Sequence, residues 1–196
     1  MIDMLLAELA AQIGEESRDD PGVVISGITT DSRAVAPGNL FVAVAGETFD
    51  GNRFVAAAVE AGAAAVVTSD PAVVGIPRIL VPDTLVALRD IATIRRREID
   101  VPVIAITGST GKTSTKDLLA AGLPGAWASP RSFNNEIGVP LTILETPDTA
   151  SYLVAEVGSR GRGHIEFLMP AVRPDVAVVT NLGVVHLETF GTVSYT

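Results

Sequence analysis

Glycine, lysine and hydroxyl side chains follow an apolar run in the stretch 101–116, VPVIAITGSTGKTSTK. The run at 103–106 is rich in β-branched residues, which predicts a buried parallel strand. It ends at a loop that holds Gly108, Gly111 and Lys112. Glycines let backbone N–H groups approach an anion, and a lysine at this spacing can reach the β- and γ-phosphates of a nucleotide. The stretch therefore predicts a phosphate-binding loop.

A helix is expected to begin directly after this loop. Residues 113–115 are hydroxyl types that favour a helix N-terminus, and Leu118 and Leu119 would give the helix its inward face. The Thr113 hydroxyl is suited to ligate Mg²⁺. The general Walker A form has glycine where this chain has Ile106, so the loop is a shortened variant. The alternative, a glycine-rich turn with a solvated lysine, requires the strand, the paired glycines and the Lys-Thr pair to coincide by chance.

The composition limits the classes of protein to which the chain can belong. With 196 residues and 47% hydrophobic content, it can form one large or two small domains. A net charge of −9 argues against a nucleic-acid or anionic membrane surface, and the absence of cysteine excludes disulfides and thiolate metal sites. Residues 1–14 lack a basic leader and predict a short amphipathic helix. No run approaches the ~20 apolar residues of a membrane span, so we expect a globular, cytoplasmic protein.

The first part of the chain predicts a small α/β unit. Two polar loops, TTDSR at 29–33 and GETFDGN at 46–52, follow expected strand ends. A break near Pro82 would close this unit, so we predict domains at 1–82 and 83–196. The expected elements are strands at 23–28, 40–44, 64–68 and 79–81, polar turns at 15–22 and 36–39, and an alanine-rich helix at 53–61.

The second part predicts a parallel sheet, because strands and helices alternate. A helix at 85–97 ends in Arg95, Arg96 and Arg97, which we interpret as a solvated helix end. The later elements are strands at 103–106, 126–128, 152–157 and 176–180, a short helix through Leu144 and a helix at 163–169. Ligands gather at the carboxyl ends of parallel strands. Just past such ends lie Lys112, Thr113, Glu156, Asn181 and His186.

One carboxylate and two histidines in this part could contact a ligand. Glu156 ends an apolar strand, and a buried carboxylate needs a cation. That cation is either a Mg²⁺ shared with Thr113 or an arginine of the segment 160–162. His186, one of only two histidines, lies in a loop that should face the nucleotide, so it could touch the ligand or the substrate. His164 is expected to start a helix and to touch the substrate.

Short segments in both parts of the chain match a known pattern. In the second part they are TGSTGKTST, SFNNEIGVPLT, EVGSRGRGHI and NLGVVHLETFG, and in the first part they are ITTDSR, PGNLFVA and GETFDGNRF. These segments resemble the ATP-dependent Mur ligases of peptidoglycan synthesis and their uridine-nucleotide-binding domain. The resemblance covers essentially the whole chain. The NNEIGVP segment makes it most similar to the member that adds D-alanyl-D-alanine to UDP-N-acetylmuramoyl-tripeptide.

The resemblance implies a fold class and a set of site residues. It implies an α/β protein in which a small N-terminal α/β domain for the UDP-linked substrate precedes a truncated P-loop-type ATPase domain with a parallel sheet. The residues implied to bind ATP are Gly108, Ser109, Thr110, Gly111, Lys112, Thr113, Ser114, Asn134 and Asn181. Those implied to hold the UDP-linked substrate are Thr30, Ser32, Arg33, Gly46, Asp50, Gly51 and Asn52. Those implied to bind Mg²⁺ are Thr113, Glu156 and His186, and those implied to be catalytic are Lys112, Asn135 and His186.

The implied reaction is phosphoryl transfer followed by ligation. The terminal carboxylate of the UDP-linked tripeptide attacks the γ-phosphate of ATP, and the amine of D-alanyl-D-alanine captures the resulting acyl phosphate. The implied enzyme is a monomer that uses ATP and Mg²⁺, without a nucleic-acid partner or membrane insertion. The alternatives are a sister ligase that adds a diamino acid or glutamate, and a non-catalytic nucleotide-binding module.

The chain departs from the family pattern at two places in its sequence and also in its length. It has Asn52 where the family often has histidine. It stops at Thr196, whereas family members continue through a carbamylated lysine and a third domain, so we expect this fragment to be inactive by itself. Residues 193–196 leave the family pattern and read like a translated sequencing adapter, which predicts an artefactual tail.

Overall fold

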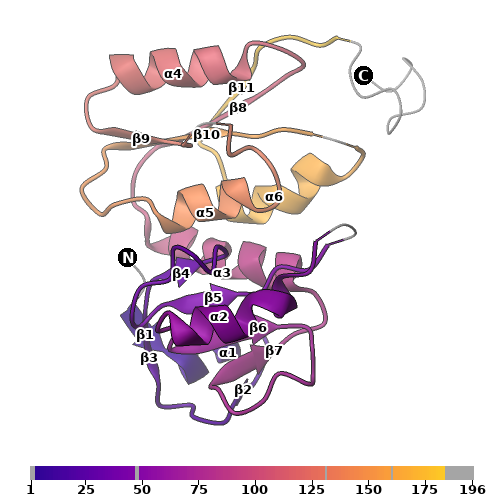
Figure 1. Ribbon diagram of the computed structural model, residues 1–196. Helices are drawn as coiled ribbons and strands as arrows, with labels where there is room; N and C mark the ends of the chain where they lie inside the picture. Colours follow the sequence, from indigo (N-terminus) through magenta and orange to yellow (C-terminus); the bar gives the residue numbers. More distant parts are fainter. Residues whose placement is uncertain (1–2, 47–48, 131, 160, 184–196) are drawn as a thin grey trace. The chain divides into compact units, whose positions relative to one another are not determined.

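The computed structural model describes residues 3–46, 49–130, 132–159 and 161–183 (Figure 1). The chain divides into two units, Met1–Ile91 and Ala92–Thr196. The division falls inside helix α3 (Thr84–Glu98), whereas the sequence places the domain boundary just before that helix, so the boundary at residue 82 stays a prediction. Among the described helices, none is long and apolar enough to cross a bilayer.

The first unit is built on a five-stranded sheet with the strand order β2-β7-β6-β5-β4. Only β2 runs antiparallel to its neighbour, and a separate antiparallel pair joins β1 to β3. Every residue of the central strands β5 and β6 is buried, as expected for strands covered on both faces. The elements are β1 (Asp3–Leu5), α1 (Leu6–Gln12), β2 (Ser17–Arg18), β3 (Val24–Ser26), β4 (Ile28–Thr29), β5 (Leu40–Val42), the 3₁₀ helix η1 (Gly51–Phe54), α2 (Val55–Glu60), β6 (Ala65–Thr68) and β7 (Arg78–Leu80).

Three expectations for this unit are wrong in detail. The first residues form β1 rather than a helix, because their backbone pairs with β3. The expected strand 23–28 is broken at Gly27, whose φ of 119° is left-handed, so β3 and β4 join different sheets. The expected polar turn 15–22 contains the edge strand β2. In each case pairing with a distant segment outweighs the local pattern.

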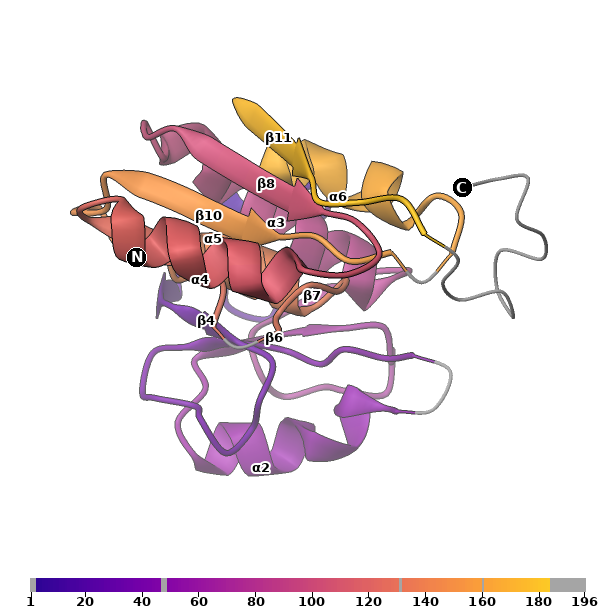
Figure 2. The same cartoon turned by 90° about the horizontal axis from the view of Figure 1, so that it is seen from above.

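The second unit is a four-stranded, wholly parallel sheet with the order β11-β8-β10-β9. Helix α4 covers one face, while α5 and α6 cover the other (Figure 1). Figure 2 shows β8 and β10 side by side, running in the same direction. This layered α/β arrangement confirms the expected fold class. The elements that follow α3 are β8 (Val103–Thr107), α4 (Lys112–Gly122), β9 (Ala126–Ala128), α5 (Gly138–Leu144), β10 (Tyr152–Glu156), α6 (His164–Val172) and β11 (Val176–Val179).

Helix α4 presents a different face to the sheet from the one expected. Leu118 is 74% exposed, whereas Lys116 is only 4% exposed. The Lys116 ammonium donates to the Ser129 carbonyl oxygen at 3.0 Å and pairs with the adjacent Asp117. Residues four apart share a helix face, so a helix that starts with Lys112 at the phosphate loop turns Lys116, and not Leu118, toward the sheet. The prediction that Leu118 lies inward is therefore wrong.

Of the three arginines that end α3, Arg97 is exposed as expected, but Arg95 and Arg96 are not solvated. Arg95 is 5% exposed and donates to the Thr146 carbonyl oxygen at 2.9 Å, and it also forms an ion pair with Asp148. Arg96 donates to the carbonyl oxygens of Val172 and Arg173 at 3.0 and 2.9 Å. The accepting carbonyls lie at the C-terminal ends of α5 and α6, where helices leave carbonyl groups without a partner. The two arginines therefore cap two other helices of this unit.

Candidate functional site

A tight loop connects β8 to α4, as the glycine spacing predicts. Gly108 and Gly111 have φ values of 132° and 81°, a conformation that side chains other than glycine rarely adopt. A Cβ atom on Gly108 would also collide with the Thr180 hydroxyl. The Lys112 ammonium folds back over this loop and donates to the Gly108 carbonyl oxygen at 2.7 Å. The lysine is thus half-buried beside the loop rather than extended into solvent.

Asn181, which we expect at the nucleotide, contacts the phosphate loop itself. Its side-chain oxygen accepts from the Thr110 backbone N–H at 2.9 Å, and its amide group donates to the Thr110 hydroxyl at 3.0 Å. The Ser109 N–H donates to the Asn181 carbonyl oxygen at 3.2 Å, and the Gly183 N–H donates to the Ser109 hydroxyl at 2.7 Å. The segment after β11 therefore holds the loop in place through several bonds.

Glu156, at the end of β10, is the buried carboxylate of the site. It is 1% exposed, and both of its carboxylate oxygens accept a hydrogen bond. The Thr113 hydroxyl donates at 2.9 Å and the Asn134 amide donates at 2.7 Å, while the Glu156 backbone N–H donates to the Ser129 hydroxyl at 3.1 Å. Burying a carboxylate is costly unless it is hydrogen-bonded, so these donors explain how Glu156 is tolerated. Thr113 and Glu156, which we expect to share a Mg²⁺, are thus in direct contact. Arg160, one of the two arginines considered as an alternative partner of Glu156, lies outside the described residues.

The oxygen atoms at this point suit a magnesium ion. The loop residues, Thr113, Asn134 and Glu156 line one cavity of about 380 Å³ together with Lys112. Mg²⁺ is commonly held by one or two carboxylates together with phosphate oxygens and water, and a hydroxyl beside a carboxylate matches that set. No group of three or more acidic, histidine or cysteine side chains that could hold a metal occurs in the described part of the chain. His186, the other expected ligand and catalytic residue, lies outside that part.

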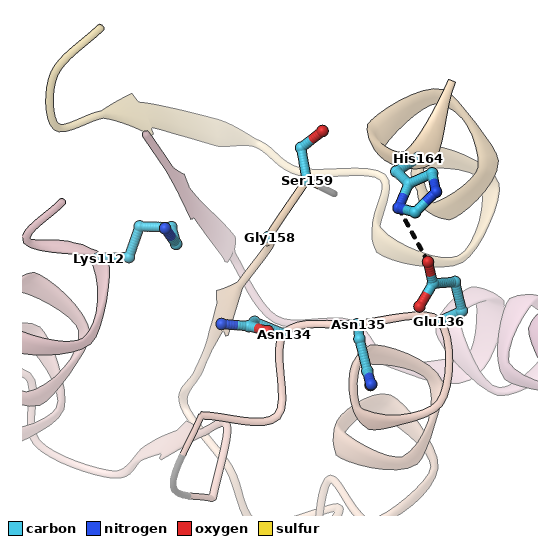
Figure 3. Close-up of a pocket in the computed structure, with 7 residues that line it drawn as sticks. All are labelled: Lys112, Asn134, Asn135, Glu136, Gly158, Ser159 and His164. Atoms are coloured by element: carbon cyan, nitrogen blue, oxygen red, sulfur yellow. Dashed lines mark ion pairs between the residues drawn. The ribbon is translucent and has the colours of Figure 1, made fainter. Parts of the chain in front are cut away.

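A second, smaller cavity of about 220 Å³ adjoins the loop (Figure 3). It is lined by Lys112, Asn134, Asn135, Glu136, Gly158, Ser159 and His164. Asn135, expected to be catalytic, accepts from the Gly138 N–H at 2.8 Å through its side-chain oxygen and so holds the start of α5. The His164 Nδ1 lies 2.9 Å from the Glu136 carboxylate. Sequence reasoning missed Glu136, although it follows the two asparagines directly.

The first unit has a cavity of its own, with a volume of about 650 Å³. Three of the expected substrate residues, Thr30, Ser32 and Arg33, line it. Sequence reasoning missed Phe49 and Phe54, whose rings stack with centroids 5.6 Å apart and planes 11° apart. The only local signal was their position on either side of the DGN turn. The other lining residues are Asp31, Phe41 and Ala57.

A bidentate ion pair lies at this cavity. The Arg33 guanidinium donates to both carboxylate oxygens of Asp31, at 2.9 and 2.7 Å. Hydrogen bonds from Arg33 lower the pKa of Asp31 to about 2, so the carboxylate is charged at any physiological pH. Because the folded-state pKa is lowered, any stability from this pair is complete above the unfolded value of 3.8 and is lost as the pH falls through about 2.

The remaining expected substrate residues do not line this cavity, and three of them, Asp50, Gly51 and Asn52, make contacts that fix the turn after Phe49. The Asp50 carboxylate accepts from the backbone and the side chain of Asn52 at 3.0 and 2.9 Å. The Thr68 hydroxyl donates to the Asn52 side-chain oxygen at 2.6 Å. Gly51 packs against the backbone that follows β5. The Gly46 N–H donates to the Phe49 carbonyl oxygen at 2.8 Å. These contacts position the loop that carries Phe49.

Replacing Gly51 with alanine is expected to lower the free energy of unfolding by about 2 kcal/mol. Its Cβ would lie 2.5 Å from the Val44 carbonyl oxygen and 2.7 Å from the Ala43 carbonyl carbon, and this backbone cannot move without disturbing the sheet. Urea denaturation measures the change. Gly46→Ala is the matched control, because no described atom lies within 4 Å of the added Cβ. Equal destabilisation by both variants would show that the tight packing at Gly51 is unimportant.

Comparison with known proteins agrees with this architecture. The model of the Mur ligase family, catalytic domain, matches residues 24–104, and the model of the Mur ligase middle domain matches residues 106–195. The UDP-N-acetylmuramoyl-tripeptide--D-alanyl-D-alanine ligase of Synechocystis sp. is 42% identical over 174 residues, a match that covers 85% of this chain and 38% of that protein. The chain thus spans well under half the length of this relative.

Two solved structures share the fold along most of the chain. A crystal structure of MurF from Acinetobacter baumannii superimposes with a TM-score of 0.89 at 33% identity, covering 98% of this chain and 44% of that one. The crystal structure of MurF from Thermotoga maritima in complex with ADP superimposes with a TM-score of 0.76 at 34% identity. That match covers 85% of this chain and 40% of the Thermotoga maritima chain. Because two models of one family match successive parts of the chain, and the matching sequences and structures carry that family's names, the chain belongs to the Mur ligase family.

Proposed function

We propose that the protein containing this chain is an ATP-dependent ligase that joins D-alanyl-D-alanine to UDP-N-acetylmuramoyl-tripeptide through an acyl phosphate. The observation that carries the proposal is the contact of Thr113 with Glu156 beside Lys112, because it places the glycine-rich loop and two side chains suited to Mg²⁺ in one cavity. The names of the matching relatives supply the substrate class, and the ADP complex of the Thermotoga maritima protein supports an adenine nucleotide as a ligand.

Residues in and beside the loop would have different roles in phosphoryl transfer. Lys112 would exchange the Gly108 carbonyl oxygen for a phosphate oxygen and stabilise the charge that moves with the γ-phosphoryl group. Thr113 and Glu156 would hold Mg²⁺, which supplies charge neutralisation to the phosphates when it is bound. Asn134 keeps the Glu156 carboxylate oriented through its 2.7 Å hydrogen bond.

Little covalent chemistry is left for the protein in the first step. The tripeptide carboxylate attacks the γ-phosphorus, ADP leaves, and the acyl phosphate remains to be captured by the amine of D-alanyl-D-alanine. Holding the carboxylate in line with the leaving group is then the main task of the site. We further propose a monomeric, cytoplasmic enzyme without nucleic-acid or membrane partners. The net charge of −9 supports the absence of a nucleic-acid or anionic-membrane surface on this chain.

A test compares amine acceptors in an assay of ATP-dependent phosphate release by the full-length protein. Phosphate release is expected with UDP-N-acetylmuramoyl-tripeptide and D-alanyl-D-alanine together, and not when either is omitted. Release with a free diamino acid or glutamate on a shorter UDP-linked peptide would assign the protein to a sister ligase. Nucleotide binding without phosphate release for every acceptor would support a non-catalytic module instead.

The cavity of the first unit is the proposed site for the uridine end of the substrate. The stacked Phe49 and Phe54 rings are 52% and 41% exposed, so they offer a flat apolar face to a base. Arg33, in the same cavity, carries a guanidinium that suits phosphate oxygens. A base beside an anion is the pattern of a nucleoside diphosphate, which matches the cavity better than a peptide does.

Replacing Phe54 with alanine is expected to weaken the binding of UDP by about tenfold, because stacking of a base on an aromatic ring contributes roughly 1–3 kcal/mol. Isothermal titration of the full-length protein with UDP measures the effect. Val74→Ala serves as the control, since Val74 is 68% exposed elsewhere in the same unit. An unchanged dissociation constant for UDP in the Phe54 variant would exclude the aromatic pair from the uridine site.

A further inference from the structure

The cavity of about 220 Å³ beside the phosphate loop contains a histidine–carboxylate pair to which phosphoryl transfer assigns no role. Glu136 lies in the loop before α5, and His164 is the first residue of α6. His164 Nδ1 and the Glu136 carboxylate are 2.9 Å apart, and their side chains are 35% and 23% exposed. Figure 3 shows the pair on one side of the cavity and Lys112 on the other, with Asn134 between them.

We propose that His164, held by Glu136, accepts a proton from the ammonium group of the incoming amine before that amine attacks the acyl phosphate. The proposal rests on the ligase activity proposed above and assigns this cavity to the second step of the reaction. An amine is a nucleophile only after it loses a proton, so a base at this point is useful to any enzyme that forms an amide from an acyl phosphate.

The contact between the two side chains sets the proton position on the imidazole. A carboxylate only accepts hydrogen bonds, so the nitrogen that faces Glu136, Nδ1, carries the hydrogen in the neutral ring. The lone pair is then on Nε2, which is the atom that takes the proton. Glu136 also stabilises the imidazolium that results. The pair therefore works as a base with a fixed tautomer.

The charges around the cavity match the two reactants of this step. Lys112, on the loop side, attracts an anionic acyl phosphate, whereas Glu136, on the far side, attracts an ammonium group. The other charged residues next to His164 in the sequence, Arg162 and Glu166, are exposed. A volume of about 220 Å³ is too small for a nucleotide and suits the amino end of a peptide.

The atoms balance without a further reactant. The ammonium gives one proton to Nε2 of His164, and the neutral nitrogen forms a C–N bond with the acyl carbon. The C–O bond to phosphate breaks, the phosphate leaves with the bonding electrons, and it takes the second proton that the new amide nitrogen loses. The imidazolium then releases its proton to water.

The test replaces His164 with asparagine and supplies two nucleophiles to the full-length protein. The asparagine amide can still donate to Glu136 but has no basic nitrogen. Hydroxylamine is already unprotonated at neutral pH and captures an acyl phosphate as a hydroxamate without a base. His164→Asn is expected to lower the rate of D-alanyl-D-alanine ligation by about 10²-fold, while hydroxamate formation stays within about twofold of the unchanged protein. Glu166→Gln, a substitution at an exposed position of the same helix, is expected to alter neither rate.

Each other outcome contradicts the assignment. If His164→Asn lowers the rates of D-alanyl-D-alanine ligation and of hydroxamate formation equally, the pair only positions α6. If neither slows, the base lies elsewhere. If the KM for D-alanyl-D-alanine rises at constant kcat, the pair binds the amine without taking its proton. Failure of the unchanged protein to form hydroxamate or ADP from ATP and the UDP-linked tripeptide would refute the ligase activity itself, which is a different result.

Discussion

Replacing Lys112 with alanine is expected to lower the turnover of the full-length protein by about 10⁴-fold, because a single cation at a migrating phosphoryl group contributes roughly 10³- to 10⁵-fold. The side chain lines both cavities of the second unit, and its ammonium contacts only the Gly108 carbonyl oxygen among the hydrogen bonds described for it. The side chain is half-buried and does not belong to the buried core of the described residues. The loss should therefore appear in kcat and leave folding intact.

Phosphate release and thermal melting of the same preparation measure this prediction. Arg97→Ala is the control, since Arg97 is an exposed basic residue at the end of α3 and removes the same charge. If the turnover of the Lys112 variant stays within tenfold of that of the unchanged protein, the prediction is wrong. The loop would then be an ordinary turn with a solvated lysine. A fall in melting temperature of many degrees would instead assign Lys112 to the fold.

The phosphate loop and its surroundings could be predicted from the sequence because the signals are local. An apolar run, two glycines that need a left-handed backbone and a Lys-Thr pair lie within a few residues of one another. The meeting of Thr113 with Glu156 follows from one further rule, that parallel strands end at the same edge of their sheet. That rule succeeds here because β8 and β10 are direct neighbours.

The errors share a physical cause, which is contact with a distant segment. Lys116 is buried because the carbonyl oxygen of Ser129, the residue after β9, accepts its hydrogen bond, and no local pattern indicates this. Arg95 is buried because it caps the end of α5. The strand β1 exists because β3 provides its partner. Propensity and charge patterns describe one element at a time, so they cannot foresee these pairings.

The candidate site shows the same division between local and distant signals. Gly108, Gly111, Lys112 and Thr113 were predicted from residue type and spacing, and the structure places them in and just after the turn between β8 and α4. Asn181 was predicted at the nucleotide as well, and the structure places it in contact with Thr110 of the loop. Glu136 and the two stacked phenylalanines were missed, because their importance depends on His164 and on the fold of the first unit. A family pattern is a reliable guide to which residues belong to a site. It is a less reliable guide to the contacts that each of those residues makes.

Replacing Glu156 with glutamine is expected to lower turnover by about 10³-fold at saturating ATP, because a magnesium-bound phosphate loses several kcal/mol of charge stabilisation when its carboxylate ligand becomes neutral. The substitution keeps the shape of the side chain. Its amide oxygen can still accept from Asn134, and its amide nitrogen can donate to the Thr113 hydroxyl, which rotates to accept. The concentration of Mg²⁺ needed for half-maximal activity should rise at least tenfold.

Stability separates this metal-binding role from a structural one. Glu156 is 1% exposed, and a neutral amide costs less to bury than a carboxylate does, so Glu156→Gln is expected to melt at the same temperature as the unchanged protein or higher. If the carboxylate were retained only to tie α4 and the Asn134 loop to β10, the variant would lose stability and activity together, and added Mg²⁺ would not restore turnover. Titration of activity with Mg²⁺ beside a melting curve distinguishes the two roles, with Glu60→Gln at an exposed position of α2 as the control.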